Sequence, residues 1–173
     1  MNKTGVIYGI NGPVVYLKGN TGFKMSEMVY VGKERLVGEV IALTKDTTTV
    51  QVFEETTGLK PGETVTASGD ALSVTLGPGI LNNIFDGIER PLSEIAKQSG
   101  KYISRGLTVD SLDTEKKWDV HVTVSEGEEL MGGAIIAETQ ETRSIVHKSM
   151  VPPDVNGTVI WAAKDGKLSL IHI

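Results

Sequence analysis

Residues 5–22 read GVIYGINGPVVYLKGNTG, and this stretch decides the fold class of the first third of the chain. Two short runs rich in Val, Ile and Tyr are separated by the turn-forming residues Asn11-Gly12-Pro13, and glycine and asparagine return after the second run. β-Branched and aromatic residues favour strands, whereas Gly, Asn and Pro supply the backbone angles of tight turns. The stretch therefore predicts two strands joined by a turn.

The same alternation of short apolar runs and turn residues continues to about residue 70. The expected strands are residues 5–10, 14–17, 28–31, 36–44 and 49–53. Five or six short strands at this spacing favour a small closed barrel, because closure removes exposed strand edges.

The period of the apolar residues changes after Gly77. They recur at the spacing of one helical face, at Ile80, Leu81, Ile84, Phe85 and Ile88. The spacing predicts a first helix that ends at Arg90, because a proline disfavours the helical conformation of the residue before it. Pro91 can open a second short helix, which Ser99-Gly100 closes.

The last third returns to the strand pattern. The expected strands are residues 118–124, 134–138, 144–148 and 158–162. Asn156-Gly157 is a typical signal for a two-residue hairpin turn. We therefore expect a second small β domain from about residue 110 onward.

Composition excludes several classes of function. The chain has 173 residues with 39% apolar residues, and 17 basic against 22 acidic side chains give a net charge of −5, which is typical of a folded acidic protein. Acidity and few aromatic residues argue against nucleic acid as a partner. The chain contains no cysteine, which excludes disulfides and thiolate ligands. The longest apolar run, residues 159–163, is too short for insertion into a membrane.

The residues give no support for a catalytic, cofactor or metal site. A phosphate-binding P-loop needs Gly-Lys followed by Ser or Thr, but the three Gly-Lys pairs precede Glu34, Tyr102 and Leu168. The histidines are scattered along the sequence, at His121, His147 and His172. We expect no catalytic residue, no cofactor-binding residue and no metal ligand in this chain.

Residues 128–136 and 151–159, on either side of Lys148, resemble the barrel-sandwich pattern of biotinyl and lipoyl carrier domains. In that family a lysine at the tip of a hairpin is acylated. The resemblance implies a second domain of barrel-sandwich type, and it offers an alternative function in which Lys148 is the acceptor. A free-standing β-barrel binding module of the oligonucleotide-binding type is another alternative, which the negative charge disfavours.

Two longer stretches are more specific: residues 54–63, EETTGLKPGE, and residues 76–92, LGPGILNNIFDGIERPL. They resemble the N-terminal part of the catalytic A subunit (alpha chain) of V-type and A-type ATPases, or ATP synthases. Shorter matches continue the resemblance from Gly5 over nearly the whole chain, at residues 105–106, 116–118, 138–142 and 150–153.

This resemblance implies a domain organisation and a set of partners. Residues 1–70 would form the β-barrel that joins B subunits and other A subunits in an alternating hexamer. Residues 71–109 would be the helical segment that opens the nucleotide-binding domain, and residues 110–167 an inserted barrel-sandwich domain that reaches the peripheral stalk. The implied structural and interface residues are Gly77, Pro78, Gly79, Phe85, Asp86, Gly87, Arg90 and Pro91. The fold class that follows is mainly β, with a barrel, a short helical linker and a second small β domain.

The resemblance also implies an activity for the parent protein. The whole catalytic alpha chain would bind ATP or ADP with Mg²⁺ and couple ATP hydrolysis or synthesis to H⁺ or Na⁺ transport, as a peripheral part of a complex on the cytoplasmic face of a membrane. The family's P-loop lies downstream of residue 173, so we expect this chain to assemble and not to catalyse.

Residues 168–173, LSLIHI, depart from the family and equal the translation of a common transposon-end sequencing adapter. We expect them to be a non-native tail. Truncation of the parent protein would also leave apolar surface exposed around Ile80, Ile84, Phe85 and Ile88.

Overall fold

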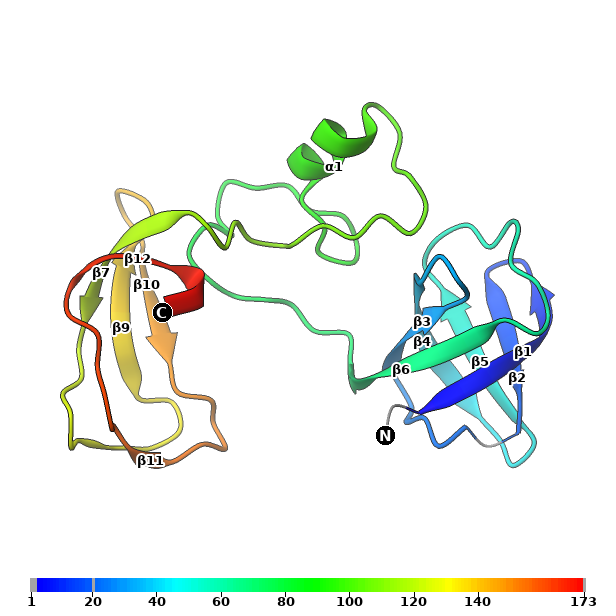
Figure 1. Cartoon of the computed structure of the whole chain (residues 1–173), viewed down its shortest axis with the longest axis horizontal. Coiled ribbons are helices and arrows are strands. Elements are labelled where there is room, and N and C mark those ends of the chain that lie inside the picture. Colours follow the sequence, from blue (N-terminus) through cyan, green and yellow to red (C-terminus); the bar gives the residue numbers. More distant parts are fainter. Residues whose placement is uncertain (1–2, 20, 173) are drawn as a thin grey trace. The chain divides into compact units, whose positions relative to one another are not determined.

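The computed structural model describes residues 3–19 and 21–172, and the chain divides into two compact units. One unit contains the N-terminal β-barrel together with residues 95–108. The other contains residues 75–94 and the chain from residue 109 onward. The units thus divide the expected 71–109 segment between them, and its boundaries stay a prediction. Each unit is described below by itself (Figure 1).

Six antiparallel strands form a closed barrel, drawn from blue to green in Figure 1. They are β1 (Thr4–Asn11), β2 (Val14–Lys18), β3 (Glu27–Val31), β4 (Leu36–Leu43), β5 (Thr47–Val52) and β6 (Thr64–Ala71). Their order around the barrel is β1-β2-β5-β4-β3-β6, and β6 pairs with β1 to close it. The expected small barrel is therefore confirmed, with β6 as its sixth strand.

The barrel forms because its strands bury every second residue. In β3, Val29 and Val31 are fully buried and alternate with partly exposed neighbours, and β4 continues this pattern with Leu36 and Val40. Successive side chains of a strand point to opposite faces, so this alternation places one set inside. The enclosed core consists of Ile7, Val15, Leu17, Phe23, Val29, Val31, Leu36, Val40, Val50, Val52 and Val65.

Irregularities in the pairing help the sheet to curve. The register shifts between Ile7 and Gly9 in β1, and again between Val40 and Ala42 in β4. An extra residue of this kind bends a strand and increases its twist, which closure of a small barrel needs.

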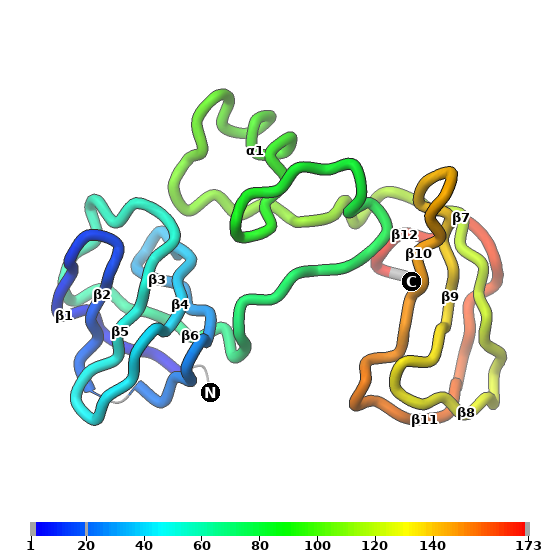
Figure 2. The backbone as a smooth tube through the Cα atoms, turned by 180° about the vertical axis from the view of Figure 1, so that it is seen from behind, coloured from blue at the N-terminus to red at the C-terminus, as the bar shows by residue number. Residues whose placement is uncertain are grey.

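The second unit contains a four-stranded antiparallel sheet in the order β10-β9-β7-β12 and a two-stranded sheet of β8 and β11. These strands are β7 (Lys117–Val122), β8 (Glu129–Leu130), β9 (Ile135–Gln140), β10 (Val146–Met150), β11 (Gly157–Thr158) and β12 (Gly166–Ser169), and the 3-10 helix η1 (Leu170–His172) follows. Figure 2 follows this backbone from behind, in yellow to red. The mainly β fold class with a second small β domain is confirmed.

The core of this second sheet is small. Trp118, Val120 and Ala137 are buried in it, and Val122 and Leu168 pack against them. Leu168 belongs to β12, where it pairs with Trp118. Strand pairing is made by the backbone and does not test where residues 168–173 come from, so the non-native origin of the tail stays a prediction.

The expected first helix over residues 80–88 is wrong. These residues form turns, and the helix α1 (Leu92–Ser99) is the only α-helix among the described residues. Asn82 and Glu89 have positive φ angles of 66° and 63°, which a right-handed helix cannot contain. The amide of Leu92 donates to the carbonyl of Ile84 and thereby closes a loop. The helix expected from Pro91 to Ser99 is confirmed as α1.

The expected hairpin turn at Asn156-Gly157 is also wrong. The Asn156 side chain accepts a hydrogen bond from the Gly132 amide at 3.1 Å, and Gly157 already belongs to β11, which pairs with β8. Of the strand expected over residues 158–162, only Thr158 belongs to β11, although Val159 still exchanges backbone hydrogen bonds with Gly127 and Glu128. The residue types Asn-Gly indicated a turn, but in the structure Asn156 connects two loops through its side-chain hydrogen bond to Gly132.

Candidate functional site

The eight expected interface residues lie on one irregular segment, residues 77–91, which belongs entirely to the second unit. Since this segment has little regular secondary structure, most of its backbone amides need partners other than a helix or sheet. The green trace of Figure 2 shows its looped course. Side-chain carboxylates supply several of these partners.

Asp86 and Arg90 form the tightest of these arrangements. One Asp86 oxygen accepts hydrogen bonds from the amides of Ile88 and Arg90 at 3.0 and 2.9 Å, and the other accepts from the Arg90 Nε at 2.7 Å. Both side chains are largely buried. Burial raises the pKa of Asp86, but the hydrogen bonds and charge of Arg90 and the Ile88 amide outweigh it, so the net pKa lies below 3.8.

Phe85 and Pro91 flank this pair and form an isolated antiparallel bridge. Pro91 is buried and Phe85 is half-buried. The bridge and the Asp86–Arg90 ion pair together close residues 85–91 into a compact loop. Phe85, Asp86, Arg90 and Pro91 therefore lie together in one loop, and their role at an interface stays a prediction.

Gly77, Pro78 and Gly79 form the other half of the segment. A Cβ atom on Gly77 would lie 2.8 Å from a Leu112 methyl group, and one on Gly79 would lie 3.3 Å from the ring of Trp118. Gly79 also has a φ of 106°, where side chains are strained. Gly79 is therefore needed for close approach to Trp118 of the second sheet, whereas Gly77 approaches the end of the flexible Leu112 side chain.

Gly87 differs from these two glycines. Its φ is not positive, and a Cβ atom there would have no neighbour within 4 Å. The fold of this chain therefore gives no local reason for a glycine at this position.

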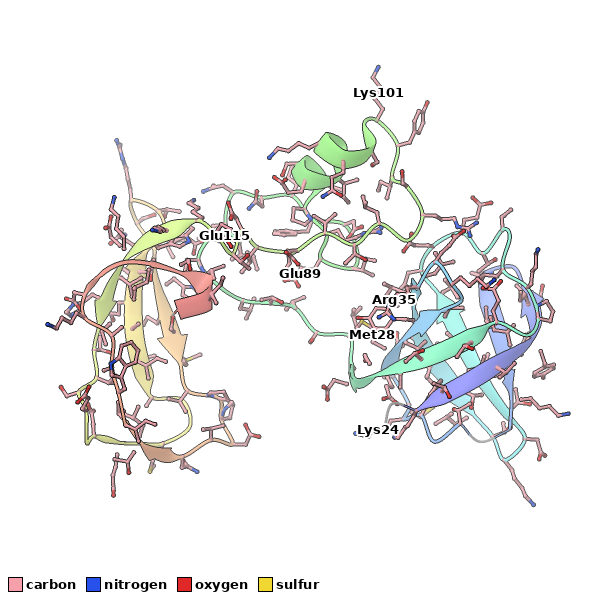
Figure 3. The ribbon with its side chains drawn as sticks, viewed as in Figure 1. Lys24, Met28, Arg35, Glu89, Lys101 and Glu115 are labelled. Atoms are coloured by element: carbon pink, nitrogen blue, oxygen red, sulfur yellow. The ribbon has the colours of Figure 1, made fainter. Side chains whose placement is uncertain are left out.

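Two further carboxylates hold the segment, and residue-type reasoning did not single them out. Glu89, labelled in Figure 3, accepts a hydrogen bond from the amide of Thr75 at 2.8 Å. One Glu141 oxygen accepts from the amides of Gly79 at 2.8 Å and Leu81 at 3.0 Å. Glu141 belongs to the 138–142 stretch that carries the family resemblance, which is the only sequence signal that pointed to it.

A comparable polar contact lies in the barrel unit. Arg105 donates to the carbonyl oxygen of Thr57 and to the carboxylate of Glu34, and the Gly106 amide donates to Glu54 at 2.9 Å. The Arg105-Gly106 pair thus attaches residues 95–108 to the loops at one end of the barrel.

Lys148 does not have the setting of an acylated carrier lysine. It lies within β10 and pairs with Glu138 of β9, with 3.6 Å between its Nζ and the carboxylate. A carrier lysine has to present its amine at the tip of a hairpin. The structure places Lys148 at a paired strand position, so the carrier alternative is not favoured.

Lys148 is instead part of a row of alternating charge across the sheet. Glu138 lies opposite His121 of β7, and the His121 Nδ1 is 2.7 Å from the Asp165 carboxylate. The hydrogen bond and negative charge of Asp165 raise the pKa of His121 above 6.5. The amide of Val122 and the bond with His121 lower the pKa of Asp165. The row is exposed to solvent, which screens its charges.

An apolar cavity of about 400 Å³ lies under the second sheet, lined by Val120, Val122, Ile136, Trp161 and neighbouring apolar residues. Its walls offer few polar groups to orient a ligand.

Within the described residues, no group of three or more His, Asp or Glu side chains could hold a metal ion. No helix in residues 3–19 and 21–172 is long and apolar enough to cross a membrane.

Comparison with known proteins accounts for both β bodies. Residues 7–69 match the β-barrel domain of the ATP synthase alpha/beta family, and residues 109–172 match the barrel-sandwich domain of the ATP synthase alpha/beta subunit. These matches coincide with the barrel and with the second sheet.

Whole-chain relatives agree with the domain matches. The chain is 49% identical over 170 residues to the V-type ATP synthase alpha chain of Halothermothrix orenii, covering 98% of this chain and 29% of the relative. It is 50% identical over 166 residues to the V-type ATP synthase alpha chain 2 of Clostridium tetani (96% and 28%). It is 51% identical over 166 residues to the A subunit of the A-type ATP synthase of Methanopyrus kandleri (96% and 28%). The chain spans less than a third of the length of these relatives.

Proposed function

Because the chain belongs to the ATP synthase alpha/beta family and corresponds to the N-terminal part of a V/A-type alpha chain, we propose that it is the assembly portion of that catalytic subunit. The observation that carries the proposal is the coincidence of two family domains with two separate β bodies, at about 50% identity to alpha-chain relatives. In the parent complex, ATP hydrolysis or synthesis is coupled to transport of H⁺ or Na⁺ across a membrane.

In this proposal the chain does not bind or hydrolyse ATP by itself. Its three Gly-Lys pairs lack the hydroxyl residue that a P-loop needs to reach Mg²⁺. ATP or ADP with Mg²⁺ is a ligand of the whole alpha chain, through residues that these 173 do not include. The assembled complex lies on the cytoplasmic face of the membrane.

The barrel is the part we assign to contacts with B subunits and with other A subunits in an alternating hexamer. Val6 and Tyr8 lie two residues apart on the outer side of β1, with 54% and 50% of their surfaces exposed. The Tyr8 ring lies 6.2 Å from that of Tyr16 on β2. We call Val6, Tyr8 and Tyr16 the β1–β2 outer patch. Exposed apolar residues grouped on a rigid sheet are typical of an interface.

The second unit is the part we assign to the peripheral stalk. Ile160 and Trp161 are 94% and 71% exposed and lie next to each other in the chain. Large apolar side chains at this exposure are costly in water, and burial against a partner would offset the cost. Ile84 of the 77–91 segment is 73% exposed, and it is a further apolar side chain that a partner would bury.

Binding to the B subunit tests the proposal. The purified 173-residue chain is mixed with the B subunit of the Halothermothrix orenii complex and examined by sedimentation velocity, and Mg-ATP is titrated into the chain by calorimetry. We expect a complex with the B subunit and no heat of ATP binding. Tyr8→Glu should weaken the complex at least about tenfold, since it places a charge in a buried contact. The control Trp161→Ser should leave the affinity for the B subunit unchanged.

Tight capture of Mg-ATP by the chain alone would contradict the proposal. So would the absence of any complex with the B subunit for a chain whose barrel is folded by circular dichroism.

A further inference from the structure

The Glu141 carboxylate occupies a small pocket of backbone amides. A single oxygen atom of Glu141 accepts hydrogen bonds from both the Gly79 and the Leu81 amides, at 2.8 and 3.0 Å. Alternating amides that point to one centre form an anion-binding concavity. Bonds of this kind to an ionised group are about twice as strong as neutral ones. Glu141 lies 60 residues or more from both partners along the chain.

The turn that Glu141 binds is fixed from other directions as well. The Asn83 side-chain amide donates to the Gly79 carbonyl oxygen at 2.6 Å. Gly77 approaches Leu112, and Gly79 approaches the ring of Trp118, which is a buried residue of the second sheet. Packing therefore holds one side of the turn, while Glu141 and Asn83 bind the polar atoms of Gly79.

Glu141 is the only one of these contacts that carries charge. Apolar packing against Trp118 and Leu112 sets how closely the turn approaches, but it is non-directional and does not fix where the backbone amides point. A carboxylate that must meet two amides at once does not tolerate such movement. Glu141 is therefore the residue that fixes the orientation of the turn relative to the second sheet.

We propose that Glu141 is the positioning residue that locks the 77–81 turn onto the second sheet. The inference rests on the proposed function for its consequence: in the whole alpha chain this lock would hold the inserted β domain in a fixed orientation at the entry to the nucleotide-binding domain. Glu141 binds no substrate. It acts through the backbone of Gly79 and Leu81.

Hydrogen exchange of single amides tests the lock in the 173-residue chain by NMR. In Glu141→Ala, the Gly79 and Leu81 amides should exchange about 10- to 100-fold faster, because a charge-assisted bond to each is lost. Their amide proton resonances should also shift upfield. The amides of the barrel strands should keep their exchange rates.

The isosteric variant separates positioning from packing. Glu141→Gln keeps the side-chain length and one acceptor oxygen but removes the charge, so we expect an intermediate acceleration of about 3- to 10-fold. If Glu141 served only to fill space, Glu141→Gln would behave like the wild type. The matched control is Glu129→Ala, which removes an exposed glutamate from β8 of the same unit and should change neither amide.

Wild-type exchange rates of Gly79 and Leu81 in Glu141→Gln, or in a folded Glu141→Ala variant, would overturn the inference. Affinity for the B subunit is measured on the same variants and should stay unchanged, because the β1–β2 outer patch lies in the other unit. Wild-type exchange rates in the Glu141 variants, together with normal binding to the B subunit, would refute only the inference. Faster exchange in the Glu141 variants, together with no binding of the wild type to the B subunit, would refute only the proposed function.

Discussion

The barrel and the second unit are both built from short β-strands, but they are stabilised by different means. Eleven buried hydrophobic residues fill the closed barrel, whereas three fill the core of the second sheet. The barrel has no free strand edge, while β10 and β12 are edge strands of the second sheet. The 77–91 segment is held instead by Asp86, Glu89 and Glu141. Non-directional burial thus shapes the barrel, and a few directional polar contacts shape the segment.

The aromatic residues allow the two bodies to be followed separately. Both tryptophans, Trp118 and Trp161, belong to the second unit, and Tyr8, Tyr16 and Tyr30 belong to the barrel. Tryptophan fluorescence therefore reports on the second unit, and tyrosine fluorescence reports mainly on the barrel. The predictions below use these two signals in urea unfolding.

The largest expected effect is in the barrel core. Leu17 is fully buried, and Leu17→Ala should lower the free energy of unfolding of the barrel by about 2–5 kcal/mol, because it removes apolar contacts and leaves a cavity. The tyrosine midpoint should fall and the tryptophan midpoint should stay. An equal fall of both midpoints would show that the two units do not unfold independently.

A smaller effect is expected at the Asp86–Arg90 pair. Arg90→Ala leaves a largely buried carboxylate without its charged partner, and it should destabilise the second unit by about 3 kcal/mol. The tryptophan midpoint should move, and that of the exposed control Lys164→Ala should not. If both variants behave alike, the 77–91 segment is not held by this pair.

Two glycines of the segment provide a matched comparison. Gly79→Ala combines a φ of 106° with contact at 3.3 Å to the Trp118 ring, so we expect a loss of about 1–2 kcal/mol in the second unit. Gly87→Ala meets no atom within 4 Å and should change stability by less than about 0.5 kcal/mol. Equal losses of stability in the two variants would show that close packing at Gly79 does not matter.

Acid should weaken the second unit through Asp86. Its folded pKa lies below the ordinary 3.8, so its stabilising effect is complete above that value and is lost as the pH falls through the folded pKa. The tryptophan midpoint of the wild type should therefore fall between about pH 4 and pH 2 more steeply than that of Asp86→Asn. Parallel pH profiles would show that Asp86 does not contribute.

The smallest expected effect is at the exposed charge row. Asp165 raises the pKa of His121 above 6.5, so the contribution of this pair is present below that value and is lost as the pH rises through the folded pKa. In an NMR titration of the His121 ring, Asp165→Asn should lower its midpoint. An unchanged midpoint in Asp165→Asn would show that Asp165 does not raise the pKa of His121.

The sequence predicts the barrel better than the segment, and the reason is physical. Alternation of buried and exposed residues is local, so β2, β3 and β4 can be identified from runs such as Val14 to Leu17. The 80–88 segment has helical spacing, but Asn82 and Glu89 adopt positive φ, and the Asp86 carboxylate binds amides that a helix would have used.

The candidate site shows the same limit. Asp86 and Arg90 are four residues apart, but the apolar spacing around them predicted a helix, whereas their ion pair lies in a closed loop. The partner of Gly79 is Glu141, 62 residues away, and no periodicity connects such positions. Long-range polar contacts depend on the final packing and cannot be read from residue types along the chain.

Urea unfolding of the wild-type chain, followed by both signals in one sample, tests most directly the claim that the barrel is a self-contained body, whereas the second unit combines a small apolar core with a few polar contacts. We expect two transitions, with the tryptophan signal changing at lower urea than the tyrosine signal. A single transition with coincident midpoints would contradict the claim.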